Sequence, residues 1–191
     1  MMTFTLDFSS VATLDDAQFD QLCRNNPDIQ FERTAQGELI IMPPVGAKSG
    51  NRELDLMGQL WAWNRQKKLG KTFSSSTCFR LPNGALRSPD ASWIQLTRWN
   101  QLNDAEQKRF APICPDFVIE LRSESDQLKT LQDKMTEYLD NGCQLGWLID
   151  PQSQELTVYQ PQRSPEILGQ PKALAGGDLM PDFICDLDFL W

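Results

Sequence analysis

A glutamate stands inside an otherwise apolar segment in the second half of this 191-residue chain. Residues 116–122, DFVIELR, have the pattern of a buried strand, residues 126–141 that of an amphipathic helix, and residues 144–150 that of a second strand. This order predicts an α/β fold. Glu120 lies within the first strand, where an unpaired charge costs several kcal/mol. Its carboxylate must therefore be paired, protonated or bound to a metal.

Further elements are expected on both sides of this unit. Helices are predicted over 13–25, with Thr13 as N-cap, and over 49–68, where Gly70 follows as a stop signal. Residues 97–111 are polar and predict a loop with a short helix. Strands are predicted over 29–34, 38–42, 73–81, 85–96 and 155–160, with hairpin turns at Gln36-Gly37 and Asn83-Gly84.

The chain has no internal repeat, low-complexity tract or linker, so a single domain over 1–191 is expected. Residues 1–48 would form an N-terminal helix and hairpin extension, and 49–160 the core. Residues 161–191 would form a tail packed on that core. The apolar residues expected to hold the tail are Phe183, Ile184, Leu187 and Trp191.

The chain contains no histidine, and this absence excludes several kinds of chemistry. Ser-His-Asp and Cys-His mechanisms, imidazole bases and histidine-dependent zinc sites are all ruled out. Hydrolysis would have to rely on carboxylates, lysine and a metal. Hard oxygen ligands favour Mg²⁺ or Mn²⁺ over zinc or copper.

The net charge indicates which partners the protein can bind, and the cysteines indicate the cellular compartment. The net charge is −8, which argues against a nonspecific nucleic-acid coat but leaves open a single basic groove. One basic cluster, whose simplest interpretation is solvated surface charge, comprises Arg65, Lys67, Lys68 and Lys71. Five widely spaced cysteines without a CxxC motif, and no evident signal peptide or membrane segment, predict a cytoplasmic protein.

Asp90 and Glu120 form the first part of a candidate site. Side chains alternate across a strand, so Glu120 shares a face with Asp116, Val118 and Arg122. Asp90 stands at the start of the neighbouring strand, and pairing of the two strands would bring both carboxylates together. Magnesium is typically held by one or two carboxylates together with waters and phosphate oxygens, and here the carbonyl of Leu121 could add a ligand. The simpler alternatives are a structural ion pair for Glu120 and a turn role for Asp90.

Lys134 is the third candidate residue. The apolar stripe of the 126–141 helix comprises Leu128, Leu131, Met135, Tyr138 and Leu139. Lys134 lies about 40° from Tyr138 on the helical wheel, at the edge of this stripe. Its stem can follow the helix–sheet boundary while the ammonium approaches the carboxylates. A solvated helix lysine is the alternative.

These segments carry a resemblance to a known family. The order of elements resembles that of the PD-(D/E)XK restriction-endonuclease-like superfamily. The amino-acid sequence itself resembles the Uma-two family of bacterial endonucleases more closely. The matching segments are ELIIMPP (38–44), RSPDASWI (87–94), PDFVIELRS (115–123), KMTEYLDNG (134–142), LGWLIDP (145–151) and LMPDFICDLDFLW (179–191). The resemblance implies a mixed sheet flanked by helices and a Mg²⁺- or Mn²⁺-dependent endonuclease acting on nucleic acid, with DNA the expected substrate. Its metal ligands would be Asp90 and Glu120.

The chain departs from the superfamily pattern two residues after the glutamate, where Arg122 replaces the usual lysine. Arginine is a poor general base, although it can clamp phosphate. The resemblance places the lysine role on the following helix, where Lys134 fits. Glu53, on the 49–68 helix, is a possible further carboxylate. Glu32 and Glu38 are weaker candidates.

Two other classes of function are compatible with much of this residue pattern. A catalytically inactive nuclease scaffold that serves binding or assembly would explain Arg122 and the acidic net charge. A phosphodiesterase of small nucleotides would use the same residues without a long basic groove.

A homodimer is also predicted. Trp61 and Trp63 lie about 200° apart on one helix, so one core face cannot bury both. Further large apolar surfaces come from Trp93, Trp99 and Trp191. Exposed aromatic residues commonly mark interfaces. The alternative is that the N-terminal hairpin covers the second tryptophan within one subunit.

Overall fold

A six-stranded sheet in the order β11-β10-β9-β8-β7-β4 forms the centre of the computed structural model, which describes residues 4–7 and 14–191. Its strands are β4 (Gly70–Ser74), β7 (Ala91–Gln95), β8 (Phe117–Leu121), β9 (Leu145–Asp150), β10 (Glu155–Tyr159) and β11 (Glu166–Gly169). Strands β8 and β9 are parallel and the other neighbours are antiparallel. The predicted α/β class and mixed sheet are confirmed.

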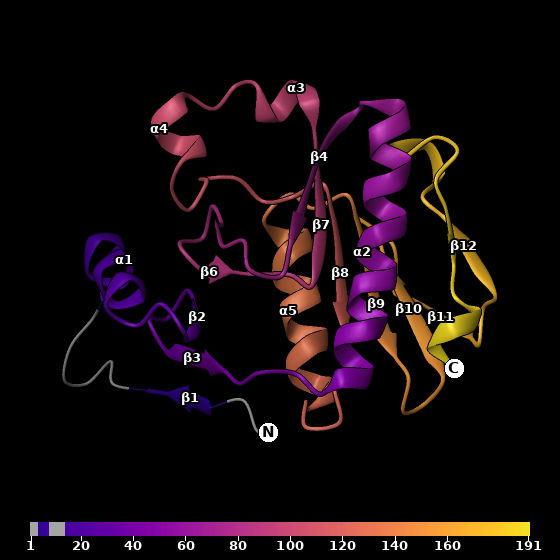
Figure 1. Cartoon of the computed structure of the whole chain (residues 1–191), viewed down its shortest axis with the longest axis horizontal. Coiled ribbons are helices and arrows are strands. Elements are labelled where there is room, and N and C mark those ends of the chain that lie inside the picture. The colour runs from indigo at the N-terminus through magenta and orange to yellow at the C-terminus, as the bar shows by residue number, and fades with distance from the viewer. Residues whose placement is uncertain (1–3, 8–13) are drawn as a thin grey trace.

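Two helices cover opposite faces of this sheet. Helix α2 (Ala47–Lys67) buries Leu56, Leu60 and Trp63 against one face. Helix α5 (Leu128–Asp140) connects the parallel strands β8 and β9 and buries Met135 and Tyr138 against the other. Figure 1 shows α2 in front of the sheet and α5 between the sheet and the N-terminal strands.

A second, five-stranded sheet has the order β1-β3-β2-β6-β5. Its strands are β1 (Phe4–Leu6), β2 (Gln30–Arg33), β3 (Leu39–Met42), β5 (Phe79–Arg80) and β6 (Leu86–Arg87). Helix α1 (Asp16–Asn25) packs Phe19 into a small apolar cluster with Phe31, Leu39 and Leu86. Asp15 caps this helix by accepting the Gln18 N–H at 2.8 Å. The helix thus begins after Asp15, and Thr13, the predicted cap, lies outside the described residues.

The single hairpin predicted over 73–81 and 85–96 is wrong. Strand β4 pairs with β7, from Gly70 opposite Gln95 to Ser74 opposite Ala91. The residues between them leave the central sheet and form the short β5–β6 hairpin of the other sheet. The turn at Gly84, with φ +89°, is where it was predicted. Pro89 has no N–H for a ladder bond, which suits the break before β7.

Residues 173–191 pack beside α2 as a folded segment and not as a simple tail. Strands β12 (Ala173–Ala175) and β13 (Ile184–Asp186) pair, and short 3₁₀ helices span Gly177–Leu179 and Asp188–Leu190. Phe183 and Leu187 are buried as predicted. Ile184 is 67% exposed, contrary to prediction, because strand alternation turns the neighbouring Cys185 inward.

The polar stretch after β7 was expected to be a loop with one short helix, and it contains two, α3 (Leu96–Trp99) and α4 (Asp104–Gln107). Trp63 is 8% exposed and Trp61 is 53% exposed, so one helix face buries only one of them. Trp93, which was expected to remain partly exposed, is buried. Among the helices of the described residues, none is long and apolar enough to cross a membrane.

Candidate functional site

The β7–β8 register brings Asp90 to Glu120. Ala91 pairs with Ile119, so Asp90, one residue earlier, lies opposite Glu120, one residue later. Asp90 Oδ2 accepts the backbone N–H of Leu121 at 2.7 Å, which fixes its carboxylate at the end of β8. Glu120 is buried and Asp90 partly exposed. The two carboxylates therefore come together as predicted, at the end of β8.

Lys134 extends from α5 to the same end of β8. Its Nζ lies 2.9 Å from Oε1 of Glu120, and its side chain is 10% exposed. Tyr138, one turn later, donates its hydroxyl to the same Glu120 oxygen at 3.0 Å. The helix stripe is arranged as predicted, and Lys134 extends along its edge. Helix α5 thus presents an ammonium and a phenol to one carboxylate.

Glu32 lies at the centre of this group, although it was among the weaker candidates predicted from the sequence. It is 2% exposed, and its Oε1 lies 2.9 Å from Lys134 Nζ. The same oxygen accepts the Ser88 N–H at 2.7 Å, and Oε2 lies 3.1 Å from Nη1 of Arg87. The signal that identified Glu120, a carboxylate within a short strand next to an apolar residue, was also present at Phe31-Glu32 but weaker.

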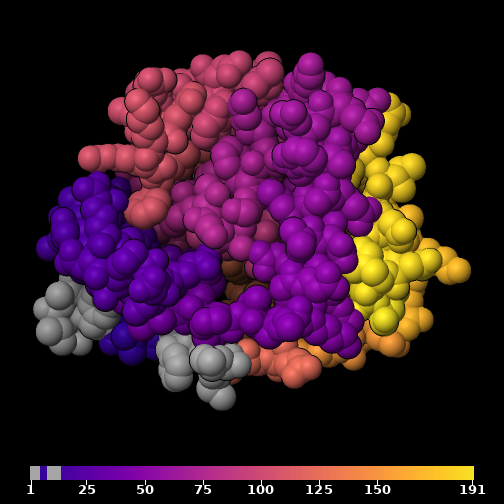
Figure 2. Space-filling model, in the orientation of Figure 1, coloured from indigo at the N-terminus to yellow at the C-terminus, as the bar shows by residue number. Residues whose placement is uncertain are grey.

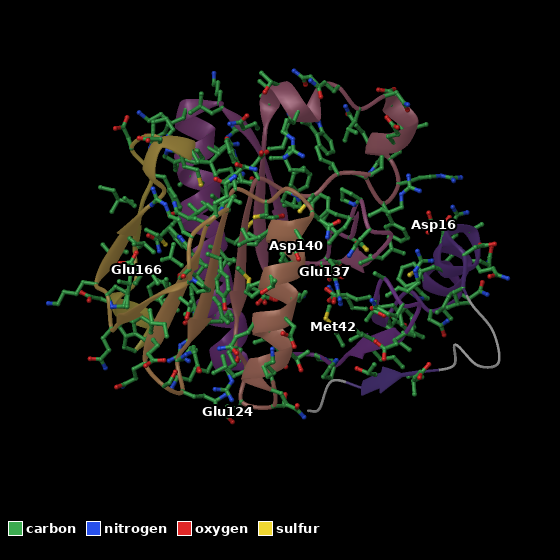
Figure 3. The ribbon with its side chains drawn as sticks, turned by 180° about the vertical axis from the view of Figure 1, so that it is seen from behind. Asp16, Met42, Glu124, Glu137, Asp140 and Glu166 are labelled. Atoms are coloured by element: carbon green, nitrogen blue, oxygen red, sulfur yellow. The ribbon has the colours of Figure 1, made fainter. Side chains whose placement is uncertain are left out.

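Arg87 extends the network to Glu137. Its Nε lies 2.6 Å from Oε2 of Glu137, on the second half of α5. Figure 3, seen from behind, shows Glu137 on the side of α5 that faces the N-terminal strands. The connected group contains four carboxylates and two cations: Asp90, Glu120, Glu32 and Glu137, with Lys134 and Arg87. Fully ionised, this group has an excess of negative charge.

The pKa directions reflect this imbalance. Burial, and then the charge of Glu120, raises the pKa of Asp90 well above its ordinary value. Burial also raises the pKa of Glu120, and Lys134 only partly opposes it. Although burial acts on Glu32 too, Lys134 and Arg87 together lower its pKa. Burial lowers the pKa of Lys134, but Glu120 and Glu32 outweigh it, so the net shift is upward and the ammonium stays charged.

The donor set suits a hard divalent cation. Oδ2 of Asp90 and Oε1 of Glu120 are held by the contacts above, whereas Oδ1 and Oε2 have no hydrogen-bond partner among the described residues. A cation between these oxygens would favour the ionised form of both carboxyl groups and so oppose the upward shift of their pKa values. No group of three or more acidic or cysteine side chains in residues 4–7 and 14–191 is arranged to hold a metal by itself. Waters, substrate oxygens or the Leu121 carbonyl would have to complete the coordination.

The other residues predicted for the site, Glu53, Arg122 and Glu38, lie at its border or outside it. Glu53, on α2, is close enough for its charge to raise the pKa of Asp90, so it borders the site. Arg122 pairs with Asp150 at 2.7 Å, and in the described part of the chain no contact joins it to Lys134. Glu38 is half-buried just before β3, and it too has no described contact with the network.

The molecular surface is hollowed in front of α5, the helix that carries Lys134 (Figure 2). Figure 2 shows the hollow between the N-terminal strands and the first half of α2, at the place where Figure 1 draws α5. The site therefore lies between two sheets and two helices. Its residues come from β2, β6, β8 and α5, and from the bend just before β7, which carries Asp90.

Comparisons with known proteins agree with this fold. A crystal structure described as that of "a putative nuclease belonging to DUF820" from Anabaena variabilis superposes with a TM-score of 0.71. It is 21% identical and the match covers 84% of this chain and 88% of that chain, which supports the restriction-endonuclease-like fold. No curated protein sequence matches. The model of the Uma2 family, described as "Putative restriction endonuclease", matches residues 16–188. The chain belongs to the Uma2 family.

Proposed function

We propose that the chain is a Mg²⁺- or Mn²⁺-dependent endonuclease that hydrolyses phosphodiester bonds, with DNA as its substrate. The observation that carries the proposal is the approach of Asp90 and Glu120 beside the ammonium of Lys134. Each carboxylate keeps one oxygen that has no hydrogen bond to the described residues. Membership of the Uma2 family supports a nuclease at the coarser level.

Asp90 and Glu120 would hold the cation, with the carbonyl of Leu121 as a further ligand. The chemistry that such a cation supplies is polarisation of a phosphate oxygen and a lowered pKa of a bound water. Asp90 is positioned for this role by the Leu121 N–H. Glu120 is positioned by Tyr138 and Lys134, which hold its other oxygen.

Lys134 would act as a cation and not as a proton acceptor, because its carboxylate neighbours raise its pKa. An ammonium has three N–H donors, and two are directed at Glu120 and Glu32. The third can donate to the attacking water or to a phosphate oxygen, where it stabilises developing negative charge. Glu32, fixed by Arg87 and Ser88, would position Lys134 without touching substrate.

Cleavage of plasmid, single-stranded DNA and RNA with Mg²⁺ or Mn²⁺ tests the proposal. We expect Asp90→Asn to reduce the cleavage rate by about 100- to 1000-fold, the range seen when one key electrostatic contact is lost. Asp104→Asn is the matched control, because that side chain is 92% exposed and pairs with Lys108 instead of with a residue of the site. Equal rates in both variants would contradict the role of Asp90, and activity in excess chelator would contradict the role of the metal. Cleavage of cyclic or dinucleotide substrates alone would favour the phosphodiesterase alternative.

Manganese binding is expected to weaken as pH falls. Asp90 and Glu120 have raised pKa values, so they retain protons at a higher pH than ordinary carboxyl groups, and bound protons compete with the metal. Calorimetric titration at about pH 5 and about pH 8 should show the tighter binding at the higher pH, with proton release detected by comparing buffers. Binding that is independent of pH, or that survives in Asp90→Asn, would contradict this site and favour the binding-module alternative.

We further propose that residues 1–191 work as one domain, because Glu32 from the N-terminal extension contacts Lys134 from the core. The homodimer stays a prediction, and the N-terminal strands leave Trp61 53% exposed. Light scattering at micromolar concentration would give about 22 kDa for a monomer. The cytoplasmic location also stays a prediction, in keeping with five free cysteines.

A further inference from the structure

The basic cluster at the end of α2 is divided by the fold. Lys67 pairs with Asp182 at 2.7 Å and belongs to the contact with the C-terminal segment. Arg65, Lys68 and Lys71 instead line a pocket of about 390 Å³ between the end of α2 and β4, an edge strand of the central sheet. No carboxylate lines this pocket, and within the described ranges no acidic side chain pairs with these three cations.

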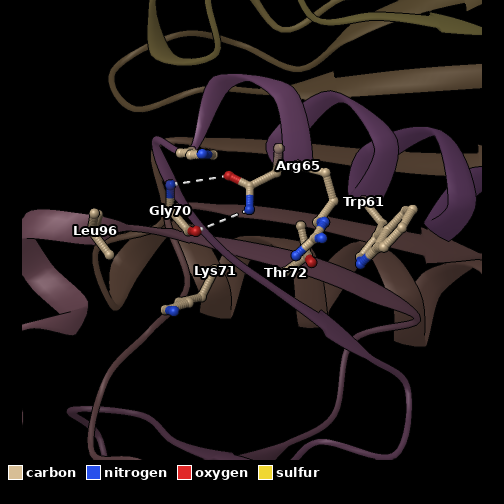
Figure 4. A pocket seen from close by; sticks show the side chains of 8 residues that line it. Trp61, Arg65, Gly70, Lys71, Thr72 and Leu96 are labelled. Carbon is tan, nitrogen blue, oxygen red and sulfur yellow. Dashed lines mark hydrogen bonds between the residues drawn. The ribbon is translucent and has the colours of Figure 1, made fainter.

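An aromatic side chain forms part of the same pocket. Trp61 is 53% exposed, and the guanidinium carbon of Arg65 lies 5.4 Å from the centre of its ring. Figure 4 shows the two side chains beside each other on α2, with Lys71 and Thr72 on the neighbouring strand. A guanidinium and an indole in this arrangement offer a charged group and a flat apolar surface to one ligand.

The wall of the pocket is fixed by hydrogen bonds. Asn64 donates to the carbonyl of Gly70 at 2.9 Å and accepts the Gly70 N–H at 3.0 Å (Figure 4). The same Asn64 oxygen accepts the indole N–H of Trp93 at 3.0 Å. A Cβ at position 70 would lie 2.2 Å from the carbonyl oxygen of Ile94, so only glycine fits there. The cations therefore project from a preorganised surface.

Helix capping does not account for the whole group. Arg65 and Lys67 in the last turn of α2, and Lys68 at its C-cap, complement the negative end of the helix dipole. Lys71 is on β4, however, and Trp61 lies two turns before the helix end. Arg65, Lys68 and Lys71 pair with no acidic side chain of the described residues, so they form a local excess of positive charge in a chain whose net charge is −8. This local excess of positive charge points to an anionic ligand.

We propose that Trp61, Arg65, Lys68 and Lys71 bind a single strand of nucleic acid, with the cations on its phosphates and the indole stacked on a base. Aromatic stacking combined with a basic groove is how proteins bind single strands without reading their sequence. Glu53 borders the candidate catalytic site on the same helix, 12 residues before Arg65, a distance of about 18 Å along α2. The patch would therefore hold a strand that extends from the catalytic site. This proposal rests on the proposed nuclease function for its choice of ligand.

The test measures binding separately from cleavage. Fluorescence anisotropy would follow labelled single-stranded DNA and RNA of about 20 nucleotides, longer than the usual site of about 4 to 16 nucleotides. The protein is the full chain carrying Asp90→Asn, in chelator, so that neither metal nor hydrolysis contributes. Comparing DNA with RNA of the same sequence identifies which strand the patch prefers.

Two variants are expected to weaken binding in different ways. Arg65→Gln/Lys71→Gln should reduce the slope of log affinity against log salt by about 1.4, since each phosphate contact to a single strand contributes about 0.7. Trp61→Ala should weaken binding by about 5- to 150-fold, the equivalent of one lost stacked base. The matched control is Arg163→Gln/Lys172→Gln, which removes the same charge from exposed positions near β11 and β12.

Unchanged affinity and salt slope in the patch variants, or no measurable binding by the parent protein, would overturn the proposal. A wild-type mass of about 44 kDa that falls to about 22 kDa in Trp61→Ala would also overturn it, because the patch would then hold a second copy of the chain. Failure of the nuclease proposal looks different: binding through the patch would persist while wild-type protein with metal cleaves nothing.

Discussion

Lys134→Met is expected to lower the free energy of unfolding by about 3 to 5 kcal/mol and to reduce cleavage by at least about 100-fold. Lys134 is the shared cation of Glu120 and Glu32, with its Nζ 2.9 Å from each. Methionine preserves the apolar stem but leaves two buried carboxylates with one fewer positive charge. Urea denaturation followed by tryptophan fluorescence measures the first effect, and the plasmid assay with metal measures the second.

Lys129→Met is the control on the same helix. Its side chain is 78% exposed and pairs with Asp133 one turn away, so we expect a change within about 0.5 kcal/mol and normal cleavage. A second comparison separates charge from packing. Adding Glu32→Gln to Lys134→Met should restore part of the lost stability, because it removes one uncompensated carboxylate, but it should not restore cleavage. If the two substitutions destabilise additively, the ion pair is not the source of the effect.

Phe183→Ala is expected to cost about 3 to 5 kcal/mol of stability, although Phe183 lies in the last ten residues of the chain. Its ring is 2% exposed and stacks on Trp147, with centroids 5.9 Å apart. Its ring centroid also lies 5.3 Å from that of Trp63 in α2 and 6.2 Å from that of Phe117 in β8. Truncation would leave a cavity between the helix and the sheet. Guanidinium denaturation of the full chain measures the loss.

Ile184→Ala provides the comparison for this result. Ile184 is the next residue, but it is 67% exposed, so we expect a change within about 0.5 kcal/mol. Similar losses in both variants would mean that the C-terminal segment is stabilised by its strand pairing and not by the aromatic cluster.

Local patterns were enough to predict much of the fold and part of the site. Alternation along 116–122 placed Glu120 on the face that α5 covers, and helical spacing placed Lys134 at the edge of its apolar stripe. The same geometry predicted that Trp61 and Trp63 could not share one buried face. These inferences depend only on the period of one element and on its immediate neighbours.

The inferences that failed depended on contacts between distant segments. Nothing near Glu32 indicates that β2 lies against α5, because that position results from the packing of two sheets. The hairpin prediction for 73–96 failed for a related reason. Asn83-Gly84 does form a turn, but the signal does not say which sheet the flanking strands join. Arg122 was considered as a phosphate clamp because of its spacing from Glu120, whereas Asp150 on the neighbouring strand pairs with it.

The contact between Glu32 and Lys134 has a consequence for the synthesis of the protein. Its two residues are separated by 102 positions, from 32 to 134, and the contact also requires β6 and β8 in place. Contacts between residues so far apart in the chain form late, because the intervening loop must first be closed. A ribosome-bound chain has no complete site until α5 has emerged. The candidate site is therefore completed only after β1 to β8 are already available to fold.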